Sequence, residues 1–363
     1  MSDRDQDLLD RLRLIRSANI GPVTYFHLLQ RFGTAAAALD AIPHLAARSG
    51  GKVPRIADMR DVETEIKAVE RLGARYLFLG QGLYPSLLAE LDSAPPALIV
   101  RGDLALLDRP AVAIVGARNA SAASCRFARG LAQDLANADM LIVSGLARGI
   151  DTAAHQGSLA HGTVGVIASG IDIAYPPENA DLQEAIATQG VLIAEQPPGK
   201  EPLARHFPYR NRIIAGMTLG TIIVEAAPKS GSLITARLAA EAGRDVFAVP
   251  GSPADPRSQG CNQLIRDGAT LIQCAADVIE SIGPMSGGRV FADSRAYRSE
   301  RISSDASDTQ RRVVVALLSH APVPVDEIIR QSGLPPAVVQ TVLLELELGG
   351  RIDRHAGGRV SLR

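Results

Sequence analysis

Tryptophan is absent from this chain of 363 residues, and aromatic residues make up only 4% of it. The cores must therefore be built from Ala, Leu, Ile and Val. Cysteine is also scarce, because Cys125, Cys261 and Cys274 are the only ones and no two of them form a Cys-x-x-Cys pair. An odd number of unpaired cysteines excludes a disulfide framework and a zinc ribbon.

Long apolar runs are missing too, since none approaches the ~20 residues that span a bilayer. The N-terminal MSDRDQDLLD is acidic and polar, unlike a signal peptide. We therefore expect a cytoplasmic protein without membrane association. The net charge of −1 excludes a chain that is basic throughout but leaves room for a local basic site. Lysines are few, so nearly all of the positive charge is arginine.

Apolar residues make up 46% of the chain, enough for a substantial core, and the length suits two or three domains of ~100–200 residues each. Residues 1–73 have helical spacing of apolar residues, with glycine turns at Ile20-Gly21-Pro22 and Phe32-Gly33-Thr34. Helix, glycine turn and helix resemble a helix-hairpin-helix or SAM-like module. A module that only packs is the alternative, and this signal alone favours it.

Residues 74–283 alternate short β runs with helical segments, which indicates a doubly wound, mostly parallel sheet of the extended Rossmann type. The first two runs have no full-length helix between them, so we expect them to pair antiparallel at one edge. The expected strands are Tyr76–Leu79, Ala97–Val100, Ala111–Val115, Met140–Val143, Thr163–Ala168, Val191–Ala194, Thr221–Val224 and Val246–Val249. The clearest helices between them are Ala122–Asn137, Ala180–Thr188 and Leu233–Ala242.

Residues 284–307 are rich in Ser, Gly, Arg and Asp and predict a flexible linker. Residues 308–363 predict three helices and a hairpin, which together make a winged helix. The expected third helix, Pro336–Leu348, carries no Arg or Lys and two glutamates. A helix that reads duplex DNA needs donors for phosphates and bases, so we favour protein or dimer contacts for this module over DNA contacts.

Glycine-rich loops follow the strands of the central domain, at the sheet edge where open parallel sheets bind ligands. Gly116 and Arg118 end one strand, where the glycine admits an anion and the arginine can bind phosphate through two nitrogens. Ser144-Gly145 and Arg148 lie between the next strand and a helix whose first amides suit a phosphate. Similar turns contain Gly170 and the run Lys229-Ser230-Gly231. Each loop alone is weak, but together they favour an extended anionic ligand.

Other motifs argue against common alternatives. There is no G-x-G-x-x-G after the first strand and no G-x-x-x-x-G-K-[ST], which disfavours a dinucleotide site and an NTPase P-loop. Asp151 and His155 share one helix face and could act as an acid–base pair or metal ligands. No third ligand stands at a recognisable spacing, so we expect a helix cap at Asp151, a surface or core-edge His155, and no metal. Glu225 is expected to be a buried carboxylate bonded to loop amides rather than a catalytic base.

The segment HFPYRNRIIA, residues 206–215, places Phe207 beside Arg210, Asn211 and Arg212. Pro208 suits the first turn of a helix. The arginines can bind phosphate, and Phe207 can stack on a base. A helix start with solvated arginines and one core phenylalanine is the alternative.

These motifs resemble the DNA-processing protein A (DprA/Smf) family over most of residues 75–282. The matching segments are VGAR at 115–118, SGLARGID at 144–151, YPPEN at 175–179, EQPPG at 195–199, HFPYRNRIIAG at 206–216, VEA at 224–226, SGSLITA at 230–236, GRDVFAVPG at 243–251 and GCNQLI at 260–265.

The resemblance implies a protein without enzymatic activity that binds single-stranded DNA during natural transformation, protects it and loads RecA recombinase onto it. It also implies a homodimer formed through the Rossmann domain, and no cofactor. Family DNA contacts fall on Arg118, on the loop at Ser144 and Gly145, and on Phe207, Arg210 and Asn211. Many members carry a lysine where this chain has Ala204, and the adjacent Arg205 is a candidate replacement.

Two rival functions stay open. The first is a hydrolase of nucleoside phosphates, similar to the lysine-decarboxylase-like phosphoribohydrolases with their PGGxGTxxE motif. The comparable stretch here, KSGSLITA, has alanine where that motif has its catalytic glutamate. The second is a transcription factor that uses the winged helix, which would need a basic recognition helix.

Overall fold

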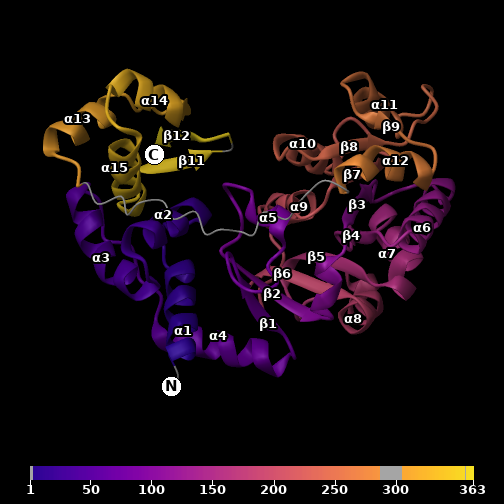
Figure 1. Ribbon diagram of the computed structural model, residues 1–363, viewed down its shortest axis with the longest axis horizontal. Coiled ribbons are helices and arrows are strands. Elements are labelled where there is room, and N and C mark those ends of the chain that lie inside the picture. Colours follow the sequence, from indigo (N-terminus) through magenta and orange to yellow (C-terminus); the bar gives the residue numbers. More distant parts are fainter. Residues whose placement is uncertain (1–2, 287–304, 356) are drawn as a thin grey trace. The chain divides into compact units, whose positions relative to one another are not determined.

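The computed structural model describes residues 3–286, 305–355 and 357–363. The chain divides into two compact units, with the division near residue 66 (Figure 1). One unit combines the N-terminal helices with the C-terminal module, and the other is the central α/β domain. Of the linker expected at 284–307, residues 284–286 instead end the helix Ala275–Ser286, residues 305–307 precede the helix Asp308–Ala316, and the rest lies outside the described residues. No helix within the described ranges is long and apolar enough to cross a membrane.

The central domain is built on a nine-stranded sheet with the order β1-β2-β6-β5-β4-β3-β7-β8-β9. Its strands are β1 (Arg75–Phe78), β2 (Ala97–Gly102), β3 (Ala111–Gly116), β4 (Leu141–Ser144), β5 (Thr163–Gly170), β6 (Val191–Gln196), β7 (Gly220–Val224), β8 (Asp245–Ala248) and β9 (Thr270–Leu271). All the expected strands are present, and the mostly parallel α/β prediction is confirmed. Strands β1 and β2 pair antiparallel at the edge, as expected, and β2 also joins β6 antiparallel. The two-residue β9 was missed because so short a strand leaves no pattern.

Helices cover both faces of this sheet (Figure 1). They are α5 (Ser86–Ala89), α6 (Ala122–Asn137), α7 (Ile150–Ser158), α8 (Ala180–Gln189), α9 (His206–Gly216), α10 (Ser232–Glu241), α11 (Gln259–Arg266) and α12 (Ala275–Ser286), with short 3-10 turns η1 (Leu104–Asp108), η2 (Leu159–His161) and η3 (Pro177–Asn179). Strand residues alternate between the two layers: Val143 packs toward α9 and α10, whereas Ile142 packs toward α6 and α7. Both strand faces are therefore buried, which explains their nearly continuous apolar sequences.

The parallel strands run outward from β3, with β4, β5 and β6 on one side and β7, β8 and β9 on the other. The loops after β3 and β7 therefore flank the point where the chain reverses its direction of winding. In open α/β sheets, ligands bind in the crevice at such a point.

The other unit contains the N-terminal and C-terminal modules. The N-terminal helices are α1 (Asp3–Arg16), α2 (Pro22–Phe32), α3 (Ala35–Arg48) and α4 (Met59–Arg71), the last of which continues into the central domain. The C-terminal module has α13 (Asp308–Ala316), β10 (Val323–Pro324), α14 (Val325–Ser332), α15 (Pro336–Leu348), β11 (Ile352–His355) and β12 (Arg359–Leu362). Its strands form a three-stranded sheet in the order β10-β12-β11, which confirms the winged helix.

Candidate functional site

A pocket of about 350 Å³ opens beyond the carboxyl ends of β3, β4 and β5, with the start of α9 forming one wall. It collects residues from segments far apart in the sequence. Its lining consists of Arg118, Asn119, Gly145, Ala147, Arg148, Ala168, Tyr175, Pro176, Pro177, Pro202, Phe207 and Arg210. Of the candidate site residues, the structure thus brings together Arg118, Gly145, Arg148, Phe207 and Arg210.

Two aromatic rings stand in this pocket, with the centroids of Tyr175 and Phe207 5.7 Å apart. The guanidinium carbons of Arg118 and Arg210 lie 5.2 and 5.9 Å from the centroid of the Phe207 ring. Cations this close to an aromatic face are attracted by its quadrupole. The pocket therefore offers flat apolar surface and positive charge side by side, a combination suited to a base and its phosphate.

The arginines of the pocket differ in how far their charge is already compensated. Arg118 is exposed and has no ion-pair partner among the described residues. Arg148 is exposed and pairs with Glu178 at the rim. Arg118 is therefore the cation with the most freedom to take a phosphate from solution.

Arg210 is only 7% exposed, an unusual depth for an arginine. Its Nη1 lies 3.8 Å from Oδ2 of Asp151, and its buried Nε has no hydrogen-bond partner in the described part of the chain. Burial lowers the pKa of Arg210, and Asp151 opposes that shift. An arginine stays protonated in any case. Its charge is thus incompletely compensated, so an anion entering the pocket would stabilise it.

Asp151 lies beneath the pocket, in the first turn of α7. Its Oδ2 accepts hydrogen bonds from the backbone amides of Gly145, at 3.2 Å, and Ala147, at 3.3 Å. Burial raises the pKa of Asp151, while Arg210 and these two amides oppose that shift. Asp151 is not the N-cap, because Gly149 holds that position. The amides of Gly145 and Ala147 therefore already have a partner in Asp151, whereas phosphate binding by this loop stays a prediction.

His155 is completely buried, which corrects the expected surface or core-edge position. Its Nδ1 lies 2.9 Å from Oγ1 of Thr163. Burial, with a contribution from Arg210, lowers the pKa of His155 to about 3. A neutral, enclosed imidazole has no access to a substrate proton. Nor does any group of three or more His, Cys, Asp or Glu in the described ranges have an arrangement that could hold a metal ion.

Glu225 lies directly after β7, next to β3, and is buried with its carboxylate hydrogen-bonded, as expected. Glu225 Oε1 accepts a hydrogen bond from the Ser121 amide at 3.0 Å, and Oε2 accepts one from the Ser121 hydroxyl at 2.7 Å. The carboxylate thus stands at the N-terminus of α6, where many Rossmann domains hold a phosphate. The open pocket lies instead on the side of β3 that faces β4 and β5.

Some candidate residues shape the sheet edge without lining the pocket. A Cβ on Gly116 would lie 1.9 Å from the Val224 carbonyl oxygen, and one on Gly170 would lie 2.6 Å from that of Pro197. Ser144 is buried, and its hydroxyl donates to the Ile114 carbonyl at 2.6 Å. These three residues thus fix the backbone positions from which the lining residues project.

The remaining candidates lie outside the pocket lining. Arg205, Lys229 and Gly231 are exposed, and Asn211 is half-buried on α9. The Ser230 hydroxyl lies 2.8 Å from the Ser232 hydroxyl, just before α10. Arg205 and Lys229 have no ion-pair partner within the described ranges. A ligand longer than the pocket would be needed to reach them.

Tyr175, Asn119 and Pro202 line the pocket but were not among the candidate residues. Tyr175 belongs to the segment YPPEN, one of the segments that match the family, and that match is the signal that could have found it. Tyr175 is 45% exposed, and its ring contact with Phe207 became visible only when α9 was placed against the β5 loop.

Comparison with protein families gives matches along most of the chain. Residues 75–283 match the model described as DNA recombination-mediator protein A. Residues 5–68 match a DprA-like N-terminal HHH domain, and residues 299–358 match a DprA winged-helix domain.

Individual relatives agree with these matches. The chain is 48% identical over 198 residues to DNA processing protein DprA of Streptococcus pneumoniae, covering 54% of this chain and 70% of the relative. It is 36% identical over 309 residues to protein Smf of Escherichia coli, covering 84% of this chain and 82% of the relative.

Two solved structures are similar. Streptococcus pneumoniae DprA superposes with a TM-score of 0.59 at 38% identity, over 68% of this chain and 82% of that one. DNA processing protein A of Helicobacter pylori superposes with a TM-score of 0.53 at 32% identity, over 58% of this chain and 97% of that one. That structure gives insights into the unique single-stranded DNA binding mode of the Helicobacter pylori protein.

Proposed function

Because this chain belongs to the DNA recombination-mediator protein A family, we propose that it binds single-stranded DNA in the pocket at the edge of its sheet and acts there as a recombination mediator. The observation that carries this proposal is the placing of Arg118 and Arg210 against the face of Phe207. Single-strand-binding proteins combine cations that follow the backbone with aromatic rings on which bases stack. The Helicobacter pylori relative binds single-stranded DNA, which supports the same ligand here.

The ligand contacts we propose come from side chains more than from backbone amides. Asp151 and Glu225 occupy the amides of two sheet-edge loops, so phosphates would contact Arg118, Arg210 and Arg148. A strand that continues past the pocket would reach the exposed Arg205 and Lys229. Contacts of this kind do not read base edges, so binding should depend little on sequence.

Fluorescence anisotropy of a labelled oligo-dT, with duplex of equal length as competitor, tests this function. We expect tight binding that duplex does not displace and that Arg118→Ala combined with Arg210→Ala abolishes. The matched control is Arg101→Ala. Arg101 lies on β2, the antiparallel strand next to β6, where it pairs with Glu184 of α8, and it does not line the pocket. Binding that survives the double substitution would place the site elsewhere.

The proposed mediator role includes protecting incoming DNA in natural transformation and loading RecA. It is supported by the match to a recombination-mediator family. RecA ATPase activity on DNA coated with single-strand-binding protein measures loading directly. Stimulation by the wild type but not by Arg118→Ala is the expected result, and equal activity with and without this protein would contradict it.

We also propose a homodimer formed through the Rossmann domain. Strand β9 is the last in the sheet order, and its Leu271 is 44% exposed. An apolar side chain on an edge strand is suited to a second copy. Light scattering should show a dimer that Leu271→Lys converts to a monomer, whereas Val313→Lys, at an exposed position of the other unit, leaves the dimer intact.

The absence of enzymatic activity is part of the same proposal. It is supported by the neutral, enclosed His155 and by Glu225, whose carboxylate is bonded to Ser121. Incubation with a panel of nucleoside phosphates should release no base. Released base would revive the hydrolase alternative.

A further inference from the structure

Helix α15 has an unusual position for the third helix of a winged helix. In winged-helix and helix-turn-helix proteins that read DNA, the corresponding recognition helix enters the major groove. Here α15 is buried on opposite faces, and its buried residues are Val338, Val339, Thr341, Val342, Leu343, Leu344, Glu345, Leu346 and Leu348. A helix that is buried on opposite faces needs two partners rather than one.

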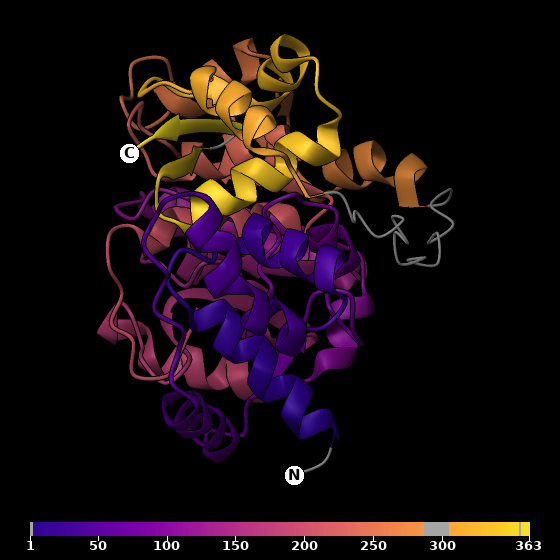
Figure 2. The same cartoon turned by 90° about the vertical axis from the view of Figure 1, so that its left-hand side faces the viewer.

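The two partners lie in the same compact unit. One face of α15, including Val342 and Leu346, packs into the core of the winged helix itself. The opposite face places Leu344 and Leu348 in the core of the N-terminal module, with Leu28 on α2 and Ile42 on α3. In Figures 1 and 2 this helix, in yellow, lies beside the indigo N-terminal helices.

Charged groups close this contact. Glu345 is 1% exposed and receives hydrogen bonds from Arg311 at 2.7 and 3.0 Å. Arg48 on α3 lies 3.9 Å from Glu345 and 2.8 Å from Asp305, and Arg31 on α2 also pairs with Asp305. Glu345 is thus surrounded by cations from both modules, Arg311 of the winged helix and Arg48 of the N-terminal helices.

Further contacts between the two modules involve the backbone, through side chains that bond to its carbonyls and through one close approach of two glycines. The side chain of Asn19 donates to the Leu348 carbonyl at 3.2 Å, and Arg351 donates to the Ser49 carbonyl at 2.7 Å. A Cβ on Gly51 would lie 2.3 Å from the carbonyl oxygen of Gly349. Only glycine permits so close an approach at this point.

We propose that the winged helix is an intramolecular partner of the N-terminal helical module, with α15 as its docking helix, rather than a reader of duplex DNA. The occupant of its recognition face is the α2–α3 surface of the same chain. Releasing that face would expose Leu344 and Leu348 to water and leave Glu345 without Arg48. This inference is independent of the single-strand site.

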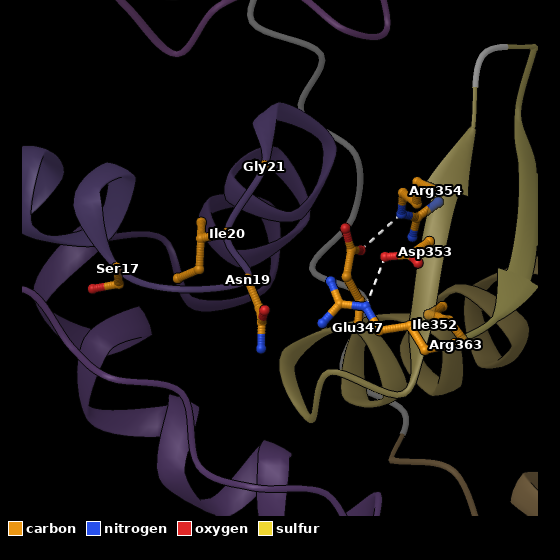
Figure 3. A pocket seen from close by; sticks show the side chains of 9 residues that line it. All are labelled: Ser17, Asn19, Ile20, Gly21, Glu347, Ile352, Asp353, Arg354 and Arg363. Atoms are coloured by element: carbon orange, nitrogen blue, oxygen red, sulfur yellow. Dashed lines mark hydrogen bonds and ion pairs between the residues drawn. The ribbon is translucent and has the colours of Figure 1, made fainter. Parts of the chain in front are cut away.

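The groove beside the contact supports the same conclusion. It has a volume of about 330 Å³, and Ser17, Asn19 and Gly21 face the wing residues across it (Figure 3). The two wing arginines that line it are both paired, Arg354 with Glu347 and Arg363 with Asp353, each at 2.7 Å. A groove with balanced charges offers little to a phosphate backbone, whose binding depends on uncompensated cations.

The test uses the full chain with a specific protease sequence inserted between Gly287 and Gly288. After cleavage, gel filtration in native buffer shows whether the C-terminal fragment stays with the rest. We expect co-elution at micromolar concentration, and separation would overturn the proposal. Co-elution that duplex DNA disrupts, with the freed fragment bound to the duplex, would overturn it too.

Charge reversal identifies the surface. Arg48→Glu, at a 40% exposed side chain, places a like charge beside Glu345 and Asp305 and should raise the dissociation constant of the cleaved fragment at least ~10-fold. Adding Asp305→Arg should restore part of the affinity. Val313→Asp, at an exposed position of the winged helix, should leave the fragment bound. No effect of Arg48→Glu would contradict docking through this face.

Discussion

The guanidinium of Arg210 fills the space that a side chain at position 145 would need. A Cβ on Gly145 would lie 1.2 Å from Nη1 of Arg210 and 2.9 Å from Oδ2 of Asp151. The absence of a side chain at residue 145 is therefore what lets Arg210 lie against Asp151 at the bottom of the pocket.

Gly145→Ala should weaken single-strand binding at least ~10-fold, because the new methyl group displaces Arg210 from its buried position. Anisotropy with oligo-dT measures the loss. The matched control is Gly130→Ala in α6, where an added Cβ meets nothing within 4 Å. That helical substitution should leave affinity unchanged and stabilise the fold by about 0.5–1 kcal/mol. Equal affinities of the two variants for oligo-dT would show that binding does not require the buried position of Arg210.

Arg118→Ala should change the salt dependence of binding. Each phosphate neutralised on a single strand contributes about −0.7 to the slope of log K against log salt concentration. Losing Arg118 should make the slope shallower by about that amount, with the largest loss of affinity at low salt. Titrations at several salt concentrations give both slopes. An unchanged slope would mean that Arg118 contacts no phosphate.

Phe207→Leu should act differently. It removes base stacking worth about 1–3 kcal/mol and keeps every charge, so affinity should fall while the salt slope stays at the wild-type value. Phe207→Tyr should retain most of the affinity because it keeps an aromatic face. A leucine variant that binds as tightly as the wild type would assign Phe207 to packing, and the same titrations decide this.

The buried His155 predicts acid sensitivity of the central domain. Its pKa in the folded state is about 3, below the value of 6.5 for an unperturbed histidine. Between these values the unfolded chain binds a proton that the folded chain does not, so the free energy of unfolding falls as pH falls from 6.5 toward 3. At pH 5 the loss from this group is on the order of 2 kcal/mol.

Urea denaturation at pH 7 and pH 5 measures this loss. His155→Gln should lower stability at pH 7, because it disturbs a buried site, but should reduce the difference between the two pH values. The exposed His161→Gln is the control and should keep the wild-type difference. A His155→Gln chain with the full wild-type pH dependence would assign the acid sensitivity to other groups.

Much of the fold was predictable because its signals are local. Apolar runs of strand length separated by glycine turns located the strands from Arg75 to Ala248, and Ser121 before an alanine-rich stretch located the start of α6. The dense motifs around Arg118 and Phe207 predicted a ligand site at the sheet edge where the structure has its pocket. Tyr175 was missed as a lining residue because its contact with Phe207 joins two loops with no shared pattern.

The sequence by itself determined the three kinds of module, the parallel sheet and the family, since period, turn chemistry and motif are properties of neighbouring residues. Only the tertiary structure decided which donors remain free for a ligand. Glu225 lies 104 residues from the Ser121 amide that it satisfies, and Asn19 lies 329 residues from the carbonyl of Leu348. Such pairs exist only after the chain has brought distant segments together, because hydrogen bonds and burial depend on separation in space. The depth of Arg210 and the docking of α15 are consequences of packing that no local pattern contains.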